Sequence, residues 1–366
     1  MLSSKMSNIQ MKFNSMLAVM VKEKASDIYI RSEHQPYLRI EGDVLLLDIP
    51  AISSEEMQEL TSLLLRPEQL ERFDQKQEEN IMYVTPDLGR FRINVYMQKN
   101  ALAMVIRKIR EDISTFGTLG LPAKLESLCM IRSGLVLITG PTGSGKSTTL
   151  ASMVKYRNSK STGHILTIED PVEFVHDDIN CIISQREVGI DTKSFSDALE
   201  SAVRQAPDVL LIGEMRDVES VKAGMYFAET GHLVLGTLHA NNAVQTIERL
   251  LQFFPQSSHM QILQAMSINL KAVLAQRLLK HKDTEIRVPA YELMVINARM
   301  RDLLVASNLQ QMARELDMFH PEGMISFDIC LINLLKLGKI SLETCIATSD
   351  NPNDLKLKIR QLGIKT

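Results

Sequence analysis

The residues from Gly140 to Thr148 have the side chains and the spacing needed to bind a nucleoside triphosphate. Gly140, Gly145, Lys146 and Ser147 fit the pattern G-x-x-x-x-G-K-[ST] of a phosphate-binding loop. Glycines let the backbone curl around phosphate, so that successive N–H groups form an anion-binding nest. The lysine can reach the β- and γ-phosphates, and the serine hydroxyl can ligate Mg²⁺. We therefore predict ATP and Mg²⁺ as cofactors, with the nucleotide held by Gly140, Pro141, Thr142, Gly143, Ser144, Gly145, Lys146, Ser147 and Thr148.

The alternative interpretation of this stretch is a glycine-rich connection that carries a surface lysine. The flanking sequence favours the phosphate loop, because an apolar strand (135–139) precedes it and helix-forming residues (147–160) follow it. A phosphate loop needs this order of elements.

The chain after residue 123 alternates between β-branched apolar strands and helices, which is typical of a parallel sheet buried on both faces. The sequence predicts strands at 135–139, 165–168, 209–212 and 233–236, and helices at 147–160, 196–205 and 217–229. Beyond 240 we predict a helical region with one strand at 289–295; its helices are 243–254, 258–279, 299–305, 308–317 and 326–337. Residues 350–366 are polar, and no element is predicted there.

Acidic residues follow two of the predicted strands, at the edge of the sheet where open α/β folds bind ligands. Glu169, Asp170 and Glu173 come after the strand 165–168, and Pro171 prevents that strand from continuing. Glu214 follows the strand 209–212 and would be costly to place there without a cation or hydrogen-bond donors. Asp217 is better explained as a helix N-cap.

Two histidines flank the strand 233–236. His232 follows a glycine turn before the strand, and His239 follows it in Thr-Leu-His-Ala. A histidine in such a place either packs against its neighbours or takes part in chemistry, and both interpretations remain open.

Residues 1–108 predict a small α+β domain with an antiparallel sheet and without a catalytic constellation. A helix over 9–21 has an apolar stripe that faces either a core or a membrane surface. Ser53 and Glu56 form a capping box, and strands at 81–85, 90–97 and 102–109 follow. The polar stretch 109–122 contains Gly117, Gly120 and Pro122 and predicts an interdomain linker, so that 123–366 is the second domain.

The composition narrows the class of protein. A chain of 366 residues favours two domains. The net charge of −3 argues against binding nucleic acid by bulk electrostatics. The four cysteines form no C-x-x-C pair, which indicates neither a zinc site nor a disulfide scaffold. Because the sequence shows no membrane-spanning run and no signal peptide, we expect a cytoplasmic protein that is at most peripheral to a membrane.

Four motifs between Gly140 and Ala240 resemble, in type and order, those of the secretion and type IV pilus ATPases. They are Gly-Pro-Thr-Gly-Ser-Gly-Lys-Ser-Thr, Thr-Ile-Glu-Asp-Pro-Val-Glu, Gly-Glu-Met-Arg-Asp, and Gly-His-Leu-Val with Thr-Leu-His-Ala. Shorter matches extend the resemblance over nearly the whole chain: Ser26-Asp-Ile, Gly89-Arg-Phe-Arg-Ile-Asn, Gln185-Arg-Glu-Val and Gln276-Arg-Leu. The resemblance implies an α/β fold with a RecA-like P-loop core domain, a smaller N-terminal PAS-like α+β domain, and a homohexameric ring.

Within this family the chain is more similar to the retraction branch, the PilT/PilU family. Assembly ATPases carry a longer N-terminal region and usually a four-cysteine zinc element, which this sequence lacks. PilT-type chains typically have Ala-Ile-Arg-Asn-Leu-Ile-Arg-Glu where this chain has Arg299-Met-Arg-Asp-Leu-Leu-Val-Ala306. The loss of the Arg-Glu pair favours a PilU-like chain that depends on a PilT-like ATPase.

The resemblance also implies roles for individual residues. Glu173 orients and deprotonates the attacking water, Glu214 and Ser147 serve the Mg²⁺, and His232 and His239 sense the γ-phosphate or a subunit interface. The arginines Arg90, Arg92 and Arg107 either reach ATP from the N-terminal domain or are ordinary strand-surface residues. The implied partners are further copies of the chain, a PilT-like ATPase and the pilus platform protein of the inner membrane, with no nucleic acid.

Three other functions remain as alternatives. The first is an assembly or type II secretion ATPase that drives extension. The second is an accessory ring subunit that senses nucleotide and hydrolyses it slowly. The third is a nucleic-acid motor on the same core, which the acidic net charge disfavours.

Overall fold

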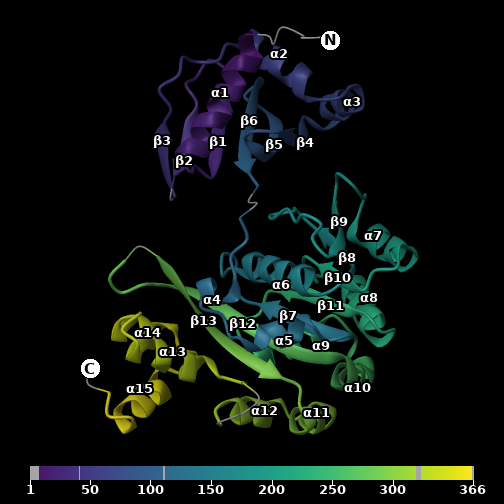
Figure 1. Cartoon of the computed structure of the whole chain (residues 1–366), viewed down its shortest axis with the longest axis vertical. Helices are drawn as coiled ribbons and strands as arrows, with labels where there is room; N and C mark the ends of the chain where they lie inside the picture. The colour runs from purple at the N-terminus through teal and green to yellow at the C-terminus, as the bar shows by residue number, and fades with distance from the viewer. Residues whose placement is uncertain (1–7, 41, 110–111, 285, 319–322, 365–366) are drawn as a thin grey trace. The chain divides into compact units, whose positions relative to one another are not determined.

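The chain forms two compact units, Met1–Glu111 and Asp112–Thr366 (Figure 1). The computed structural model describes residues 8–40, 42–109, 112–284, 286–318 and 323–364. In these ranges no helix is both long enough and apolar enough to cross a bilayer.

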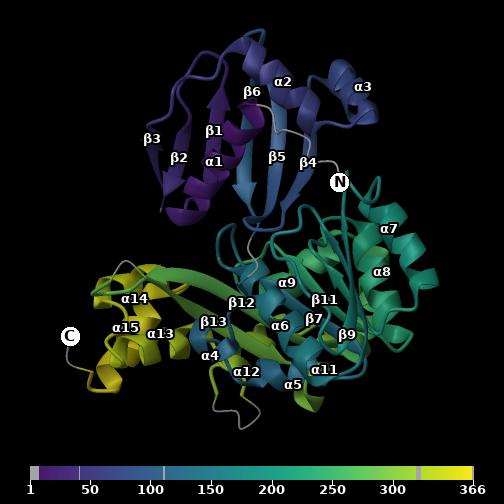
Figure 2. The ribbon, with the colours of Figure 1, turned by 45° about the horizontal axis from the view of Figure 1, so that its top comes forward.

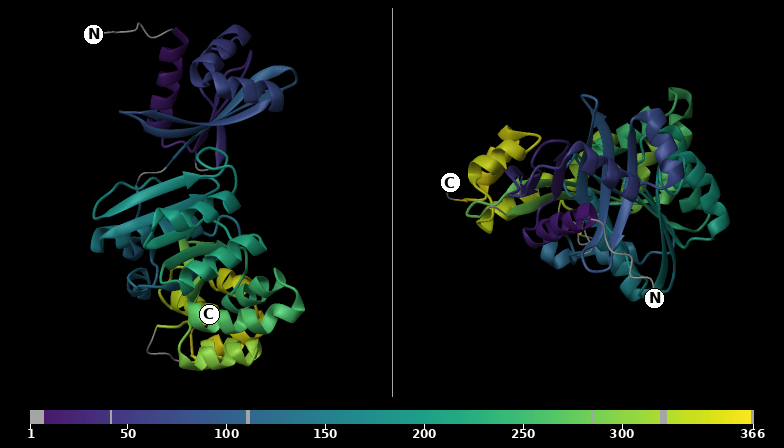
Figure 3. Two further views of the ribbon diagram at one scale, coloured as in Figure 1. Left: turned by 90° about the vertical axis from the view of Figure 1, so that its right-hand side faces the viewer. Right: turned by 90° about the horizontal axis from the view of Figure 1, so that it is seen from above.

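The first unit is a six-stranded antiparallel sheet with helices on one face (Figure 3). The strand order is β3-β2-β1-β6-β5-β4. The strands are β1 (Asp27–Arg31), β2 (Tyr37–Ile40), β3 (Asp43–Leu46), β4 (Glu78–Thr85), β5 (Gly89–Gln98) and β6 (Ala101–Lys108). The helices are α1 (Asn8–Lys22), α2 (Ser54–Leu64) and α3 (Pro67–Lys76).

The apolar stripe of α1 faces the core of this unit. Phe13, Met16 and Leu17 are buried together with strand residues such as Ile28 and Phe91. Of the two interpretations of the stripe, the core-facing one is therefore confirmed. The capping box of α2 is also confirmed, since the Ser53 hydroxyl accepts from the Glu56 amide and the Glu56 carboxylate accepts from the Ser53 amide.

The second unit is built on a seven-stranded sheet of order β13-β12-β7-β11-β10-β8-β9, in which only β13 runs antiparallel to its neighbour. Its strands are β7 (Gly134–Thr139), β8 (Gly163–Glu169), β9 (Cys181–Glu187), β10 (Val209–Ile212), β11 (Leu233–Leu238), β12 (Leu270–Lys280) and β13 (Arg287–Val295). Its helices are α4 (Phe116–Leu119), α5 (Lys124–Cys129), α6 (Lys146–Lys160), α7 (Phe195–Ala202), α8 (Val218–Glu229), α9 (Ala243–Gln252), α10 (His259–Asn269), α11 (Ala298–Val305), α12 (Leu309–Leu316), α13 (Phe327–Lys336), α14 (Leu342–Thr348) and α15 (Pro352–Gln361).

Helices cover both faces of this sheet (Figure 2). Along β7, Leu135 and Leu137 point into a core with α8, α9 and α10, while Val136 and Ile138 point into a second core with α5 and α6. The helices α13 to α15 pack on β12 and β13 in a third cluster. The predicted α/β fold class is confirmed.

The predicted helix over 258–279 is wrong in its second half, where β12 begins at Leu270. The residues 272–276 are buried on both faces of the sheet, and a continuous apolar run does not distinguish a buried strand from a buried helix. The prediction also missed the edge strand β9 and the helices α14 and α15. Leu355 and Ile359 of α15 are buried four residues apart, a pattern hidden among polar neighbours.

The stretch from 112 to 122 differs from the predicted linker, because it packs within the second unit. Ile113, Phe116 and Leu121 are buried there. The Ser152 hydroxyl of α6 donates to the Ser114 carbonyl at 2.9 Å, and Lys155 Nζ donates to the Ile113 carbonyl at 2.5 Å. Three apolar side chains in a polar sequence are enough to attach the segment. Residues 110 and 111 of the predicted linker lie outside the described residues.

Candidate active site

The phosphate loop joins the end of β7 to the start of α6 and needs its glycines for two reasons. Gly140, Gly143 and Gly145 all have positive φ, at 148°, 77° and 89°. A Cβ on Gly140 would also lie 2.3 Å from the Gln276 carbonyl oxygen and 2.5 Å from Ser144 Oγ. At Gly143 a Cβ would meet nothing within 4 Å, so this part of the loop is open.

Gln276 of β12 fastens the loop to the sheet. Its amide nitrogen donates to the Ser144 carbonyl at 2.7 Å, and its amide oxygen accepts from the Thr149 hydroxyl at 2.8 Å. The Gln276 side chain is buried, and a buried amide needs such partners. We missed this role because the strand itself was predicted as a helix; the signal was the polar pair Gln276-Arg277 within an apolar run.

Lys146 lies at the centre of the site. Its Nζ donates to the carbonyls of Gly140 at 2.9 Å and Pro141 at 3.1 Å. Burial lowers the pKa of Lys146, while the charges of Glu214 and Glu173 oppose that shift. The structure therefore brings both predicted carboxylates into the electrostatic environment of the loop lysine.

The loop fits a bound phosphate chain. The Ser144 hydroxyl is buried without a hydrogen-bond partner among the described residues, and α6 presents its N-terminus directly after Gly145. Open space at Gly143, a lysine whose Nζ donates to two backbone carbonyls, and a helix N-terminus are features that bind anions.

Glu214 has the polar neighbours that its position requires, a histidine and an arginine. His239 Nε2 lies 3.3 Å from Glu214 Oε1, and Arg216 Nε lies 3.9 Å from Oε2. Arg216 also donates to Asp170 at 2.7 Å, which links the two acidic strand ends. The N-cap role of Asp217 is confirmed, because its carboxylate accepts from the Ser220 amide.

The side chains that would hold Mg²⁺ are oxygen donors. Ser147 is in the first turn of α6 and Glu214 follows β10, and hydroxyl and carboxylate oxygens suit this hard cation. No group of three or more His, Cys, Asp or Glu residues that could hold a metal occurs in the part of the chain that the structure describes. A metal here would therefore complete its coordination with phosphate oxygens and water.

Glu173 is exposed on an irregular segment that follows β8. Its neighbours Val172 and Phe174 are buried, whereas the Glu173 side chain is exposed. The carboxylate is thus accessible to solvent near Lys146.

Glu169, at the end of β8, has a different environment. Its Oε1 accepts from the Thr167 hydroxyl at 2.7 Å and from the Gln185 amide at 3.3 Å. Burial raises the pKa of Glu169 to about 7, and the charges of Glu173 and Glu187 add to this shift against the two hydrogen bonds.

The raised pKa of Glu169 predicts a pH dependence of stability. The folded pKa of about 7 exceeds the ordinary value of 4.5, so the folded state binds more protons between these values and loses stability as the pH rises through them. Glu169→Gln removes this loss. We expect the free energy of unfolding of the variant, relative to that of the wild type, to increase by up to about 3 kcal/mol between pH 5 and pH 8. Denaturation of both proteins across this range measures it; a constant difference would contradict the prediction.

His232 and His239 lie at opposite ends of β11, His232 before its first residue and His239 after its last. Leu238 pairs with Thr139, which places His239 beside Gly140. The Gly134 amide donates to the His232 carbonyl, which places His232 at the other end of β7, roughly 20 Å away along the strand. Hence the structure does not bring His232 to the phosphate loop of its own chain. Its ring contacts the Phe227 carbonyl at 3.0 Å and packs edge-on against Phe227.

The three candidate arginines of the first unit, Arg90, Arg92 and Arg107, lie on β5 and β6. Arg92 pairs in register with Arg107, and Arg107 with Asp27. Arg107 Nε donates to the buried Asp27 carboxylate at 2.8 Å, which gives it a structural role. Arg90 is exposed. Both interpretations of these arginines remain open.

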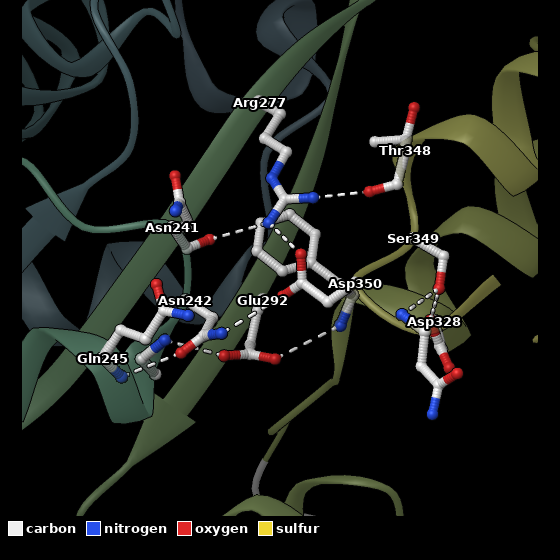
Figure 4. A network of polar contacts seen from close by, with 12 residues as sticks. Asn241, Asn242, Gln245, Arg277, Glu292, Asp328, Thr348, Ser349 and Asp350 are labelled. Atoms are coloured by element: carbon white, nitrogen blue, oxygen red, sulfur yellow. Dashed lines mark hydrogen bonds and ion pairs between the residues drawn. The ribbon is translucent and has the colours of Figure 1, made fainter. Parts of the chain in front are cut away.

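Figure 4 shows how Arg277 of β12 ties the segment after His239 to the C-terminal helices. Arg277 donates to the Asn241 carbonyl at 3.1 Å and to the Thr348 carbonyl. It also pairs with Asp350 at 2.6 Å and stacks on the Phe327 ring at 4.5 Å. This network fixes the backbone two residues beyond His239.

Glu292 of β13 holds the starts of two helices in the same region (Figure 4). Its carboxylate accepts from the amides of Ala243 at 2.8 Å and Phe327 at 3.4 Å, the first residues of α9 and α13. Burial raises the pKa of Glu292 to about 7, and these two bonds oppose the shift. The arrangement connects the carboxyl edge of the sheet to the helical C-terminal part.

The site as a whole is suited to phosphoryl transfer. A phosphate-binding loop, a lysine, two carboxylates and a histidine meet at the carboxyl edge of a parallel sheet, and this chemistry depends on positioning and charge stabilisation.

Comparison with known proteins agrees with this geometry. Residues 3–325 match the family described as Type II/IV secretion system protein. The type IV pilus ATPase PilU of Pseudomonas aeruginosa strain PAO1 is 39% identical over 350 residues, which are 96% of this chain and 92% of that protein. The type IV pilus retraction ATPase PilT of the same strain is 38% identical over 333 residues, 91% of this chain and 96% of that protein. A crystal structure of the pilus retraction motor PilT with bound ADP superimposes with a TM-score of 0.88 at 38% identity, covering 96% of this chain and 100% of that one.

Proposed function

The chain belongs to the Type II/IV secretion system protein family, and from this we propose that it is a motor ATPase of the PilU type that powers type IV pilus retraction and twitching motility. The observation that carries the proposal is the convergence of Lys146, Glu173 and Glu214 on one phosphate loop. Nearly full-length similarity to two retraction ATPases supports the same conclusion.

The chain's own residues divide the work of hydrolysis. The loop amides and Lys146 hold the phosphates, and Glu173 orients a water and accepts its proton. Ser147 and Glu214 would hold Mg²⁺, which supplies charge neutralisation on the phosphate oxygens when bound. His239 holds Glu214 by its contact at 3.3 Å. The roles that the resemblance implies for His232 at a subunit interface and for Arg90, Arg92 and Arg107 remain proposals.

We propose that the chain acts as a homohexamer at the cytoplasmic face of the inner membrane, which it reaches only through partners. These partners are a PilT-like ATPase and the pilus platform protein. The proposed division into a PAS-like domain (1–108) and a RecA-like ATPase domain agrees with the two compact units, with the boundary after Glu111.

Dependence on a second ATPase rests on one departure from the PilT pattern. Val305 is the last residue of α11 and is 41% exposed, and Ala306 caps the helix. An Arg-Glu pair at this place would present two charges on the surface, whereas Val305 and Ala306 present uncharged methyl groups. A slowly hydrolysing accessory subunit is therefore the second candidate function.

Hydrolysis and pilus number test the proposal together. The purified chain should hydrolyse ATP, and Lys146→Ala should lower the rate at least about 100-fold, because the phosphates lose their cationic partner.

Deletion of the gene should leave cells with excess surface pili. Bald cells would instead support an extension ATPase. Retraction force without the PilT-like partner separates an autonomous motor from an accessory subunit.

A further inference from the structure

The segment that carries Glu173 has no regular secondary structure of its own. Val172 and Glu173 lie outside any strand or helix, between the end of β8 and the next strand, β9. Backbone N–H and C=O groups in such a segment need other partners, or the segment is not held in place. We call residues 172–176 the Glu173 segment.

Two side chains of β9 supply these partners. The Gln185 amide nitrogen donates to the Phe174 carbonyl at 2.9 Å, and its amide oxygen accepts from the His176 amide at 2.9 Å. The Glu187 carboxylate accepts from the Val172 amide at 3.0 Å. Backbone groups on both sides of Glu173 are therefore bound to the same edge strand.

Packing holds the segment from the other side. Phe174 is buried with Ile113 and Ala151, the latter from the helix that begins in the phosphate loop. Val172 is also buried. Glu173 is thus an exposed residue between two anchored neighbours, and the backbone that carries it has little freedom to move.

We propose that Gln185 is the positioning residue for Glu173, and that it acts by holding the backbone on which this carboxylate is mounted. The inference rests on the proposed function, because it assumes that Glu173 activates water. An amide is required at position 185 because it must donate to one backbone group and accept from another. The same nitrogen reaches Glu169 at 3.3 Å, so Gln185 also fixes the neighbouring acid.

Gln185→Met tests the proposal, since it preserves the length of the side chain and removes both hydrogen bonds to the Glu173 segment together with the one to Glu169. We expect kcat for ATP hydrolysis to fall about 10- to 100-fold, because small displacements of a reacting group are costly. The KM for ATP and the Kd for ADP should stay within about threefold, because the phosphate loop is untouched. Amide hydrogen exchange over residues 172–176 should become faster.

A double-mutant cycle distinguishes positioning from general damage. If Gln185 acts through Glu173, the double variant Glu173→Gln/Gln185→Met should turn over as slowly as Glu173→Gln alone. A further loss as large as the one in the wild-type background would overturn the proposal. So would a kcat for Gln185→Met within twofold of wild type.

Ser184→Ala is the matched control. Ser184 also lies on β9 and its hydroxyl contacts His164 at 2.9 Å, but among the described residues its hydroxyl makes no hydrogen bond to the Glu173 segment. It should leave kcat unchanged. If Gln185→Met does not fold, Gln185→Asn serves instead, because its shorter amide cannot reach both backbone groups.

Failure of the proposed function gives a different result. Glu173→Gln would then hydrolyse ATP at nearly the wild-type rate. In that case only amide hydrogen exchange would test whether Gln185 holds the Glu173 segment. Faster exchange of residues 172–176 in Gln185→Met would keep Gln185 as the residue that holds this segment, and unchanged exchange would overturn it.

Discussion

Replacing Glu173 with glutamine is expected to lower kcat for ATP hydrolysis about 100- to 1,000-fold, the range for loss of a general base. The amide cannot accept a proton from water, but it keeps the size of the side chain. Glu173 is exposed and its neighbours are anchored, so the substitution disturbs neither the core nor the segment's backbone. Affinity for ADP should stay within about threefold, since ADP binding needs the loop and not the base.

Steady-state hydrolysis and ADP titration of the same preparation measure this effect. Asp177→Asn is the matched control, because Asp177 is an exposed acid four residues further along the chain. It should hydrolyse ATP at the wild-type rate. Turnover of Glu173→Gln within about tenfold of wild type would remove Glu173 from the role of base.

The parts of the site that were predictable are those coded in short stretches. The phosphate loop, the acids after β8 and β10, and the N-cap Asp217 each depend on residues a few positions apart. A strand followed by a carboxylate puts that carboxylate at the binding edge of a parallel sheet, whatever the strand order. Local pattern therefore gave Lys146, Glu173 and Glu214.

The parts that were missed depend on strand neighbours. Gln276 reaches Thr149 over 127 positions, and Gln185 reaches the Glu173 segment from a strand that was not predicted. No local pattern encodes which strand lies beside which. The two histidines are a different case. One strand, β11, separates them, so the sequence already implied that His232 and His239 lie at opposite ends of that strand.

The second large effect is expected at Gly140, where replacement by alanine should strongly weaken nucleotide binding and also destabilise the second unit. The new Cβ would lie 2.3 Å from the Gln276 carbonyl oxygen, and β12 cannot readily move aside because it is paired on both sides, with β13 and β7. Positive φ adds strain of about 1–2 kcal/mol. We expect ADP affinity to fall at least about 100-fold, because the loop amides lose their arrangement.

Two other glycines separate the causes of this effect. Gly189 also has positive φ and open space around it, so Gly189→Ala should show the strain in a lower melting temperature and leave ADP affinity unchanged. Gly143 has the same open space but lies in the loop, so Gly143→Ala should lose affinity for ADP with a stability close to that of Gly189→Ala. Calorimetric titration and thermal denaturation of the three variants measure both quantities. If Gly140→Ala resembled Gly189→Ala in both, the contact with Gln276 would not be what shapes the loop. If Gly143→Ala bound ADP normally, the phosphates would not lie over the open part of the loop.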